Sequence, residues 1–163
     1  MTVRRVVTGH NERGRAVVLS DDRIAGKALP DLNAAFAVVW TTVTSPVDND
    51  DATDRAQLPI GLTQPGGSVL RVVELGPGSC SPMHRTDSLD YGIVLDGDVE
   101  LELDDGAITP LRAGDIVVQR GTMHAWLNRS ATPAHVAFIL LDATPATAGG
   151  RPLSPVMDDI APH

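Results

Sequence analysis

The chain has 163 residues, 42% of them hydrophobic, 21% charged and only 3% aromatic. A domain of this length buries about two-thirds of its unfolded surface, which allows a hydrophobic core. The net charge of −8 argues against a nucleic-acid or anionic-membrane partner, and the single cysteine, Cys80, excludes an internal disulfide. The densest apolar runs, Ala34–Trp40 and Val136–Leu141, are too short to span a bilayer. We therefore expect a soluble, cytoplasmic protein.

The N-terminal part of the chain is irregular. Val3–Val7 and Arg15–Leu19 flank a polar run at residues 10–14, which predicts a hairpin. Phe36–Thr44 is rich in β-branched residues and is predicted as a further strand. Pro46–Gly67 is predicted as a long polar loop.

From residue 67 onward, short apolar segments alternate with turns. In the segment 98–103, Val99, Leu101 and Leu103 alternate with acidic residues, the period of a strand with one dry and one wet face. The Asp-Gly pair at 105–106 is a hairpin signal. The predicted strands are Ser68–Leu75, Asp90–Leu95, Asp98–Leu103, Ala107–Leu111, Asp115–Gln119, Met123–Leu127 and His135–Leu141. Such spacing predicts an all-β antiparallel sandwich or barrel.

Polar residues fall at positions of these strands that should face the interior. His84 and Thr86 share one face of an extended backbone, and so do His124 and Trp126. Asp90 opens a strand between the two pairs. A small barrel has room for its side chains and one small ligand or ion. Two imidazoles and one carboxylate match the facial triad of non-haem iron sites and also suit zinc, manganese or nickel.

The two histidines lie in segments similar to the two sequence motifs of the cupin superfamily. Gly78-x5-His84-x-Thr86-x3-Asp90-x6-Gly97 resembles the first motif, Gly-x5-His-x-His-x(3,4)-Glu-x6-Gly. Gly114-x5-Arg120-Gly121-x2-His124-x3-Asn128 resembles the second, Gly-x5-Pro-x-Gly-x2-His-x3-Asn. The resemblance covers about residues 66–143. It implies an antiparallel jelly-roll barrel with an N-terminal strand extension, a fold that carries many different activities.

The first motif departs from the family's metal-ligand set, which is typically three histidines and one glutamate. Thr86 stands where the second histidine is expected, and Asp90 replaces the glutamate. The remaining set, His84, Asp90 and His124, is predicted to be catalytic and to bind a divalent transition metal: iron, zinc, manganese or nickel.

Three further residues are candidates for substrate binding. Thr86 shares the face of His84, and Gln119 lies on the preceding strand, from which its amide could orient a substrate or a bound water. Trp126 could stack on a planar substrate or belong to the core. Arg85 and Arg120 flank the site, but strand alternation directs both outward.

Three functions remain open. The first is a metal-assisted enzyme, such as an oxygenase, decarboxylase, isomerase or lyase, acting on a small oxo, hydroxy or aromatic compound. The second is a metal-free enzyme, a dehydratase or cyclase, in which His84 and His124 act as acid and base and Asp90 orients one imidazole. The third is a binding module without turnover.

One domain over residues 1–163 is expected to account for the whole chain. Its core barrel would span about residues 66–143, residues 1–65 would add strands and a loop, and residues 144–163 would form an extended or partly disordered tail. The expected partners are a small molecule and a second copy of the chain, with neither nucleic acid nor membrane. The resemblance to cupins implies a homodimer built in part from Val3–Leu19.

Overall fold

The structure is a computed structural model that describes residues 1–56 and 58–156. The described residues form strands and two short 3-10 helices and contain no α-helix, so the predicted all-β class is confirmed. The strands are β1 (Thr2–His10), β2 (Ala16–Ala25), β3 (Lys27–Leu29), β4 (Ala34–Thr42), β5 (Ser68–Leu75), β6 (Ser88–Asp96), β7 (Asp98–Leu103), β8 (Ile108–Arg112), β9 (Ile116–Arg120), β10 (His124–Leu127), β11 (Ala134–Asp142), β12 (Thr147–Ala148) and β13 (Arg151–Pro152). The 3-10 helices are η1 (Pro30–Leu32) and η2 (Asp104–Gly106). No helix among these residues is long and apolar enough to cross a membrane.

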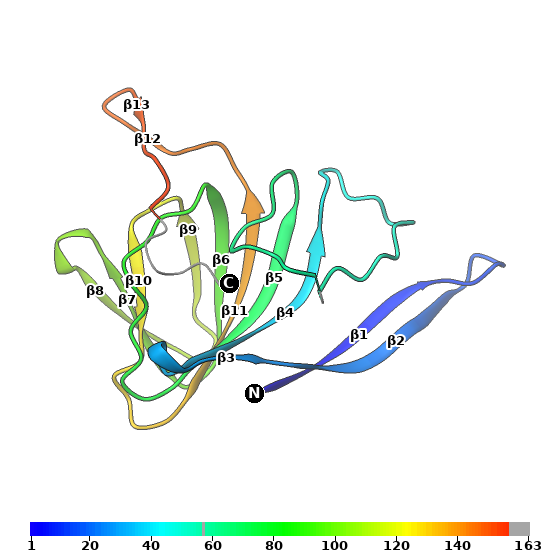
Figure 1. The fold of residues 1–163 in the computed structure, drawn as a ribbon, viewed down its shortest axis with the longest axis horizontal. Coiled ribbons are helices and arrows are strands. Elements are labelled where there is room, and N and C mark those ends of the chain that lie inside the picture. Colours follow the sequence, from blue (N-terminus) through cyan, green and yellow to red (C-terminus); the bar gives the residue numbers. More distant parts are fainter. Residues whose placement is uncertain (57, 157–163) are drawn as a thin grey trace.

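Two antiparallel sheets enclose the interior of a barrel (Figure 1). The larger has six strands in the order β3-β4-β5-β11-β6-β9, and the smaller has the order β10-β7-β8. The hydrophobic core lies between them and is formed by Leu75, Val94, Val99, Leu101, Trp126, Ala134 and Val136. This is the antiparallel barrel that the spacing of turns predicted.

Strand β6 shows how the sequence directs side chains inward. Ser88, Asp90, Gly92 and Val94 are buried, whereas the residues between them are partly exposed. Successive residues of a strand face opposite sides, so this alternation places Asp90 inside the barrel. The bounds of β5 and β7 agree with those predicted from the sequence.

The predicted N-terminal hairpin is present and extends away from the barrel (Figure 1). Its base is held by Arg5, whose guanidinium bonds Asp22 and Asp54 and lies over the ring of Trp40. Beyond this anchor, three apolar side chains of the arm are exposed: Val6, Val18 and Leu19. The arm therefore presents apolar surface that the barrel of the same chain does not cover.

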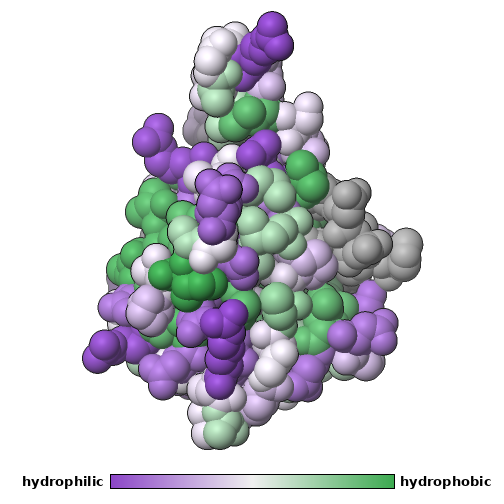
Figure 2. Space-filling view, turned by 90° about the vertical axis from the view of Figure 1, so that its left-hand side faces the viewer, coloured by the Kyte–Doolittle hydropathy of each residue, from purple (hydrophilic) through white to green (hydrophobic). Residues whose placement is uncertain are grey.

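The C-terminal tail is more regular than predicted. Strands β12 and β13 form a small hairpin that stands off the barrel (Figure 1). Gly149 and Gly150, between the two strands, both have positive φ, which a tight two-residue turn requires. Seen from the side of β8, the hairpin rises above a face of intermixed hydrophilic and hydrophobic residues (Figure 2). The prediction for residues 157–163 lies outside the described residues.

Candidate active site

The barrel contains a cavity of about 770 Å³. All six site residues predicted from the sequence line it: His84, Thr86, Asp90, Gln119, His124 and Trp126. The predicted convergence of two imidazoles and a carboxyl group inside a closed β structure is therefore confirmed. Their roles remain predictions.

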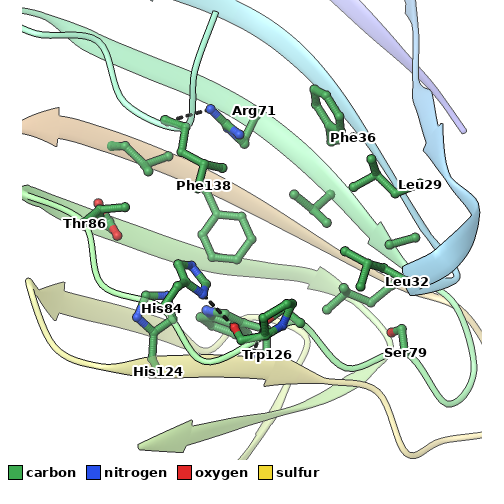
Figure 3. Close-up of a pocket in the computed structure, with 18 of the residues that line it drawn as sticks. Leu29, Leu32, Phe36, Arg71, Ser79, His84, Thr86, His124, Trp126 and Phe138 are labelled. Atoms are coloured by element: carbon green, nitrogen blue, oxygen red, sulfur yellow. Dashed lines mark hydrogen bonds between the residues drawn. The ribbon is translucent and has the colours of Figure 1, made fainter. Parts of the chain in front are cut away.

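The two histidines meet because their backbones pair. His84 lies in the segment before β6 and forms an isolated antiparallel bridge with His124, the first residue of β10. Each backbone N–H donates to the other residue's carbonyl oxygen at 2.9 Å. The ring centroids lie 4.0 Å apart, with 54° between the ring planes (Figure 3). Main-chain hydrogen bonds thus fix the separation of the two imidazoles.

Hydrogen bonds to carbonyl oxygens fix the tautomer of both rings. Nδ1 of His84 lies 2.9 Å from the oxygen of Pro82, and Nδ1 of His124 lies 2.9 Å from that of Thr122. A carbonyl oxygen only accepts, so Nδ1 carries the hydrogen in each ring. In a neutral imidazole the lone pair is then on Nε2. Both rings therefore present a basic nitrogen.

The surroundings keep both imidazoles neutral. Burial lowers the pKa of His84 from its ordinary value. Burial, followed by the neighbouring His84, lowers the pKa of His124 to about 4. At neutral pH both side chains are bases without charge.

A chain of hydrogen bonds connects the polar side chains of the cavity. Nε2 of Gln119 lies 2.7 Å from Oδ2 of Asp90 and 3.0 Å from Nε2 of His124, so the amide donates a hydrogen to each. The hydroxyl of Ser88 donates to Oδ1 of Asp90 at 2.5 Å, and that of Thr86 lies 2.7 Å from Ser88. Since Ser88 uses its hydrogen on Asp90, Thr86 is the donor to Ser88. Burial raises the pKa of Asp90, and the bonds from Ser88 and Gln119 oppose that shift.

These contacts do not fit the predicted three-ligand metal site. Among residues 1–56 and 58–156, no group of three or more His, Cys, Asp or Glu side chains is placed to hold a metal ion. The N–H groups of Gln119 point at both Asp90 and His124, and an N–H donor cannot face a cation. The metal centre stays a prediction.

An aromatic pair forms part of the cavity wall. Trp126 and Phe138 meet edge to face, with ring centroids 5.1 Å apart and planes at 82°. Gly92 leaves the space that this pair occupies, because a Cβ there would lie 3.1 Å from Trp126 and 3.3 Å from Phe138. The indole Nε1 of Trp126 is buried without a hydrogen-bond partner.

Arg71 also lines the cavity, although neither cupin-like sequence motif contains it. It lies on β5 in a segment of mostly apolar residues, and it shares the inward face with Val69, Val73 and Leu75. A charge on the dry face of a predicted strand was the signal that could have identified it. Arg85 and Arg120, which flank the motif residues, do not line the cavity.

Comparisons with known proteins agree with this fold. Residues 71–140 match the family model described as the cupin domain. Two solved structures show the same fold: the polyketide cyclase RemF from Streptomyces resistomycificus (16% identity, TM-score 0.53, 76% of this chain and 77% of that chain) and a Cupin 2 conserved barrel domain protein from Salinispora arenicola (20% identity, TM-score 0.50, 72% and 82%).

Fungal proteins are similar over nearly the whole sequence. Phomopsin biosynthesis cluster protein C' of Diaporthe leptostromiformis is 40% identical over 174 residues, which cover 99% of this chain and 92% of that protein. The cupin-domain-containing oxidoreductase fogC of Aspergillus ruber is 35% identical over 164 residues, 96% of this chain and 81% of that protein. The chain therefore belongs to the cupin family and is related to fungal cupin-domain oxidoreductases.

Proposed function

We propose that the protein is an enzyme that transfers a proton on a small, mainly apolar carbonyl compound, with His84 as the base. One observation carries the proposal: Nε2 of His84 is basic and borders the cavity, and no hydrogen bond among the described residues engages it. The equivalent nitrogen of His124 already accepts from Gln119. His84 is thus the imidazole available to a substrate.

The chemistry follows from the protonation states. Nε2 of His84 takes a proton from a carbon next to a carbonyl, and the electron pair of the C–H bond moves to form an enolate. The imidazolium then returns the proton to another carbon, which isomerises the substrate, or to a departing hydroxyl, which leaves as water. His124 lies 4.0 Å away and remains neutral because its pKa is about 4, so it does not repel the new charge. Asp90 acts through Gln119 as a positioning residue.

The cavity favours an apolar substrate of moderate size. Its volume of about 770 Å³ lies within the range of about 300–1,000 Å³ that is usual for small-molecule sites. Most of its wall is hydrophobic, including Leu29, Phe36, Val73, Phe138 and Leu140. Trp126 and Phe138 offer flat surfaces on which a conjugated ring could stack.

The names of the relatives support a role in small-molecule biosynthesis. One relative is named for a phomopsin biosynthesis cluster, and another is named an oxidoreductase. The proposed step accords with the biosynthetic name; an oxidation would need an oxidant in addition to this proton transfer.

Hydrogen exchange tests the proposal. A panel of aromatic 1,3-dicarbonyl and hydroxy-ketone compounds is incubated with the protein in D2O, and deuterium incorporation is followed by mass spectrometry. We expect exchange that falls by about 10²–10⁴-fold in His84→Gln, the usual contribution of a general base. His135→Gln is the matched control, because His135 bonds Glu74 and Asp96 and does not line the cavity.

The same assay separates acid–base catalysis from metal assistance. The proposed step predicts equal rates with and without a chelator, and no gain on addition of iron, zinc, manganese or nickel. Exchange that appears only with one of these metals would overturn it, and so would unchanged exchange in His84→Gln.

A further inference from the structure

Arg71 carries a buried charge that forms no ion pair within the part of the chain that the structure describes. Its side chain is 5% exposed. Nη2 donates to the carbonyl oxygens of Gly61 and Leu62 at 2.8 and 2.6 Å, while Nε is buried with no partner. Burial lowers the pKa of Arg71 to about 10, so the guanidinium remains charged at neutral pH. Buried charges are normally paired, so this one calls for an anion.

Other unpaired polar atoms gather in the same cavity. Besides Nε of Arg71, Oγ of Ser79, Oε1 of Gln119 and Nε1 of Trp126 are buried without partners, and all four residues line the cavity. Buried polar groups of native proteins are seldom left unbonded. The wall of this cavity therefore carries hydrogen-bonding groups that the described residues do not satisfy.

Asp90 does not serve as the missing counterion. Its charge acts on Arg71 from a distance, but its two carboxylate oxygens already accept from Ser88 and Gln119. The two residues are also held on different strands, with β11 between β5 and β6. Among the described residues, Nε of the guanidinium therefore has no acceptor.

The position of Arg71 relative to the two imidazoles determines how a ligand would lie in the cavity. In the strand register, Phe138 pairs with Arg71 on one side and with Gly92 on the other. Figure 3 shows the ring of Phe138 between Arg71 and the two imidazoles. The guanidinium also lies over the ring of Phe36, 5.9 Å from its centroid. A ligand that reaches from Arg71 to His84 would thus pass along aromatic surfaces.

We propose that Arg71 binds a carboxylate of the substrate, which makes the substrate class a flat, mainly apolar organic acid. The carboxylate would supply the counterion and accept the unused N–H groups of the guanidinium. Only the placement of the reacting carbon at His84 rests on the proposed function. Anion binding by Arg71 does not.

The test compares a matched pair of probes, 2-naphthoate and 2-naphthamide, by isothermal titration calorimetry at pH 7.5. Wild-type protein is expected to bind the acid about tenfold more tightly than the amide, the effect of one buried charged hydrogen bond. Arg71→Met should bind the two probes equally, and Arg71→Lys should keep part of the preference. Arg120→Met is the control and should keep all of it, because Arg120 is exposed and does not line the cavity.

A purely structural role for Arg71 predicts a different result. Loss of the bonds to Gly61 and Leu62 would weaken the binding of both probes alike and leave the ratio of their affinities unchanged. Equal affinities in the wild type, absence of acid binding, or a preference that survives in Arg71→Met would each overturn the proposal. If Arg71→Met does not fold, the proposal is tested by the ratio of acid to amide affinity in the wild type and in Arg71→Lys.

His84→Gln separates this inference from the proposed function. The variant should lose hydrogen exchange and keep the acid preference. Hydrogen exchange that survives in His84→Gln would overturn the proposed role of His84 but not anion binding by Arg71. Equal affinities of the wild type for the acid and the amide would overturn anion binding by Arg71 alone.

Discussion

Gln119 on β9 and Asp90 on β6 are register partners, and the amide nitrogen of Gln119 lies 2.7 Å from Oδ2 of Asp90. The second hydrogen of that amide is donated to Nε2 of His124. One neutral side chain therefore satisfies a buried carboxyl group and a buried imidazole at once. This bridge occupies Nε2 of His124, whereas no hydrogen bond among the described residues engages Nε2 of His84.

Removal of the bridge should destabilise the fold. Gln119→Met keeps the length of the side chain but leaves Oδ2 of Asp90 and Nε2 of His124 without their donor. Because a buried polar group that loses its partner costs about 1–3 kcal/mol, we expect the free energy of unfolding to fall by about 2 kcal/mol. Urea denaturation measures it. Gln64→Met, in the loop before β5, is the control, and equal stability of the two variants would show that the bridge contributes nothing.

The buried His124 should make the protein sensitive to acid. Its pKa is about 4 when folded and about 6.5 when unfolded, so the unfolded state binds more protons between these values. Stability is therefore full above pH 6.5 and decreases as the pH falls toward 4, by up to about 3 kcal/mol. Thermal unfolding across this range measures the slope.

Comparison with His124→Gln isolates this contribution. His84 titrates in the same direction, and Asp90, whose pKa burial raises, titrates in the opposite one. The difference between wild type and variant cancels both to first order. A pH slope that is equally steep in His124→Gln would refute the assignment.

His135 should act in the opposite sense at higher pH. Although burial lowers the pKa of His135, its hydrogen bonds with Asp96 and Glu74 raise it overall. Its contribution is complete below the unfolded value of about 6.5 and is lost as the pH rises through the folded value. The difference in free energy of unfolding between wild type and His135→Gln should therefore become smaller as the pH rises. A constant gap would contradict this.

A methyl group at Gly92 should reduce binding more than stability. In Gly92→Ala the new Cβ would lie 3.1–3.3 Å from Trp126 and Phe138, which must shift by a few tenths of an ångström. Both rings border the cavity and can shift into it, so the cost in stability should stay below about 1 kcal/mol. Affinity for 2-naphthoate should fall, as titration calorimetry would show. Unchanged affinity would mean that ligands do not use this part of the wall.

The N-terminal arm should join two copies of the chain. Val18 on the arm is 59% exposed, and Val118 on the edge strand β9 is 56% exposed, so one chain offers apolar surface at two separate places. Each surface suits the other in a second copy. We expect light scattering after size exclusion to give twice the mass of the chain, and Val18→Asp to shift the protein toward the monomer.

Val47→Asp is the control for this experiment. Val47 is 52% exposed but lies in the loop between β4 and β5, outside both the arm and strand β9. It should leave the oligomeric state unchanged. A monomeric wild type, or equal effects of the two aspartates, would count against the predicted homodimer.

Turn chemistry and alternation predicted most of the fold. The bounds of β5 and β7 were predicted correctly, because a glycine-rich turn follows β5 and an Asp-Gly turn follows β7. β3 was not predicted, since three residues are too few to show a period. The hairpin β12–β13 was missed because the alanine- and proline-rich tail concealed the Gly149-Gly150 turn.

The site was predictable where it follows spacing and not where it depends on packing. Strand alternation and the motifs placed His84 and His124 in one cavity, as the structure confirms. The link between Gln119 and Asp90 joins residues 29 apart and depends on the register of β6 with β9, which no local pattern specifies. Arg71 belongs to neither sequence motif. Its proposed role follows only from its burial without an ion pair among the described residues.

The backbone bridge between His84 and His124 has a consequence for how such proteins diversify. Backbone hydrogen bonds set the distance between the two histidines, so this distance does not depend on the side chains of the cavity wall. Replacing Phe36, Leu29 or Leu140 would reshape the chamber without disturbing the pair. Under the proposed function, substitutions in the cavity wall would change the substrate while the two imidazoles keep their positions.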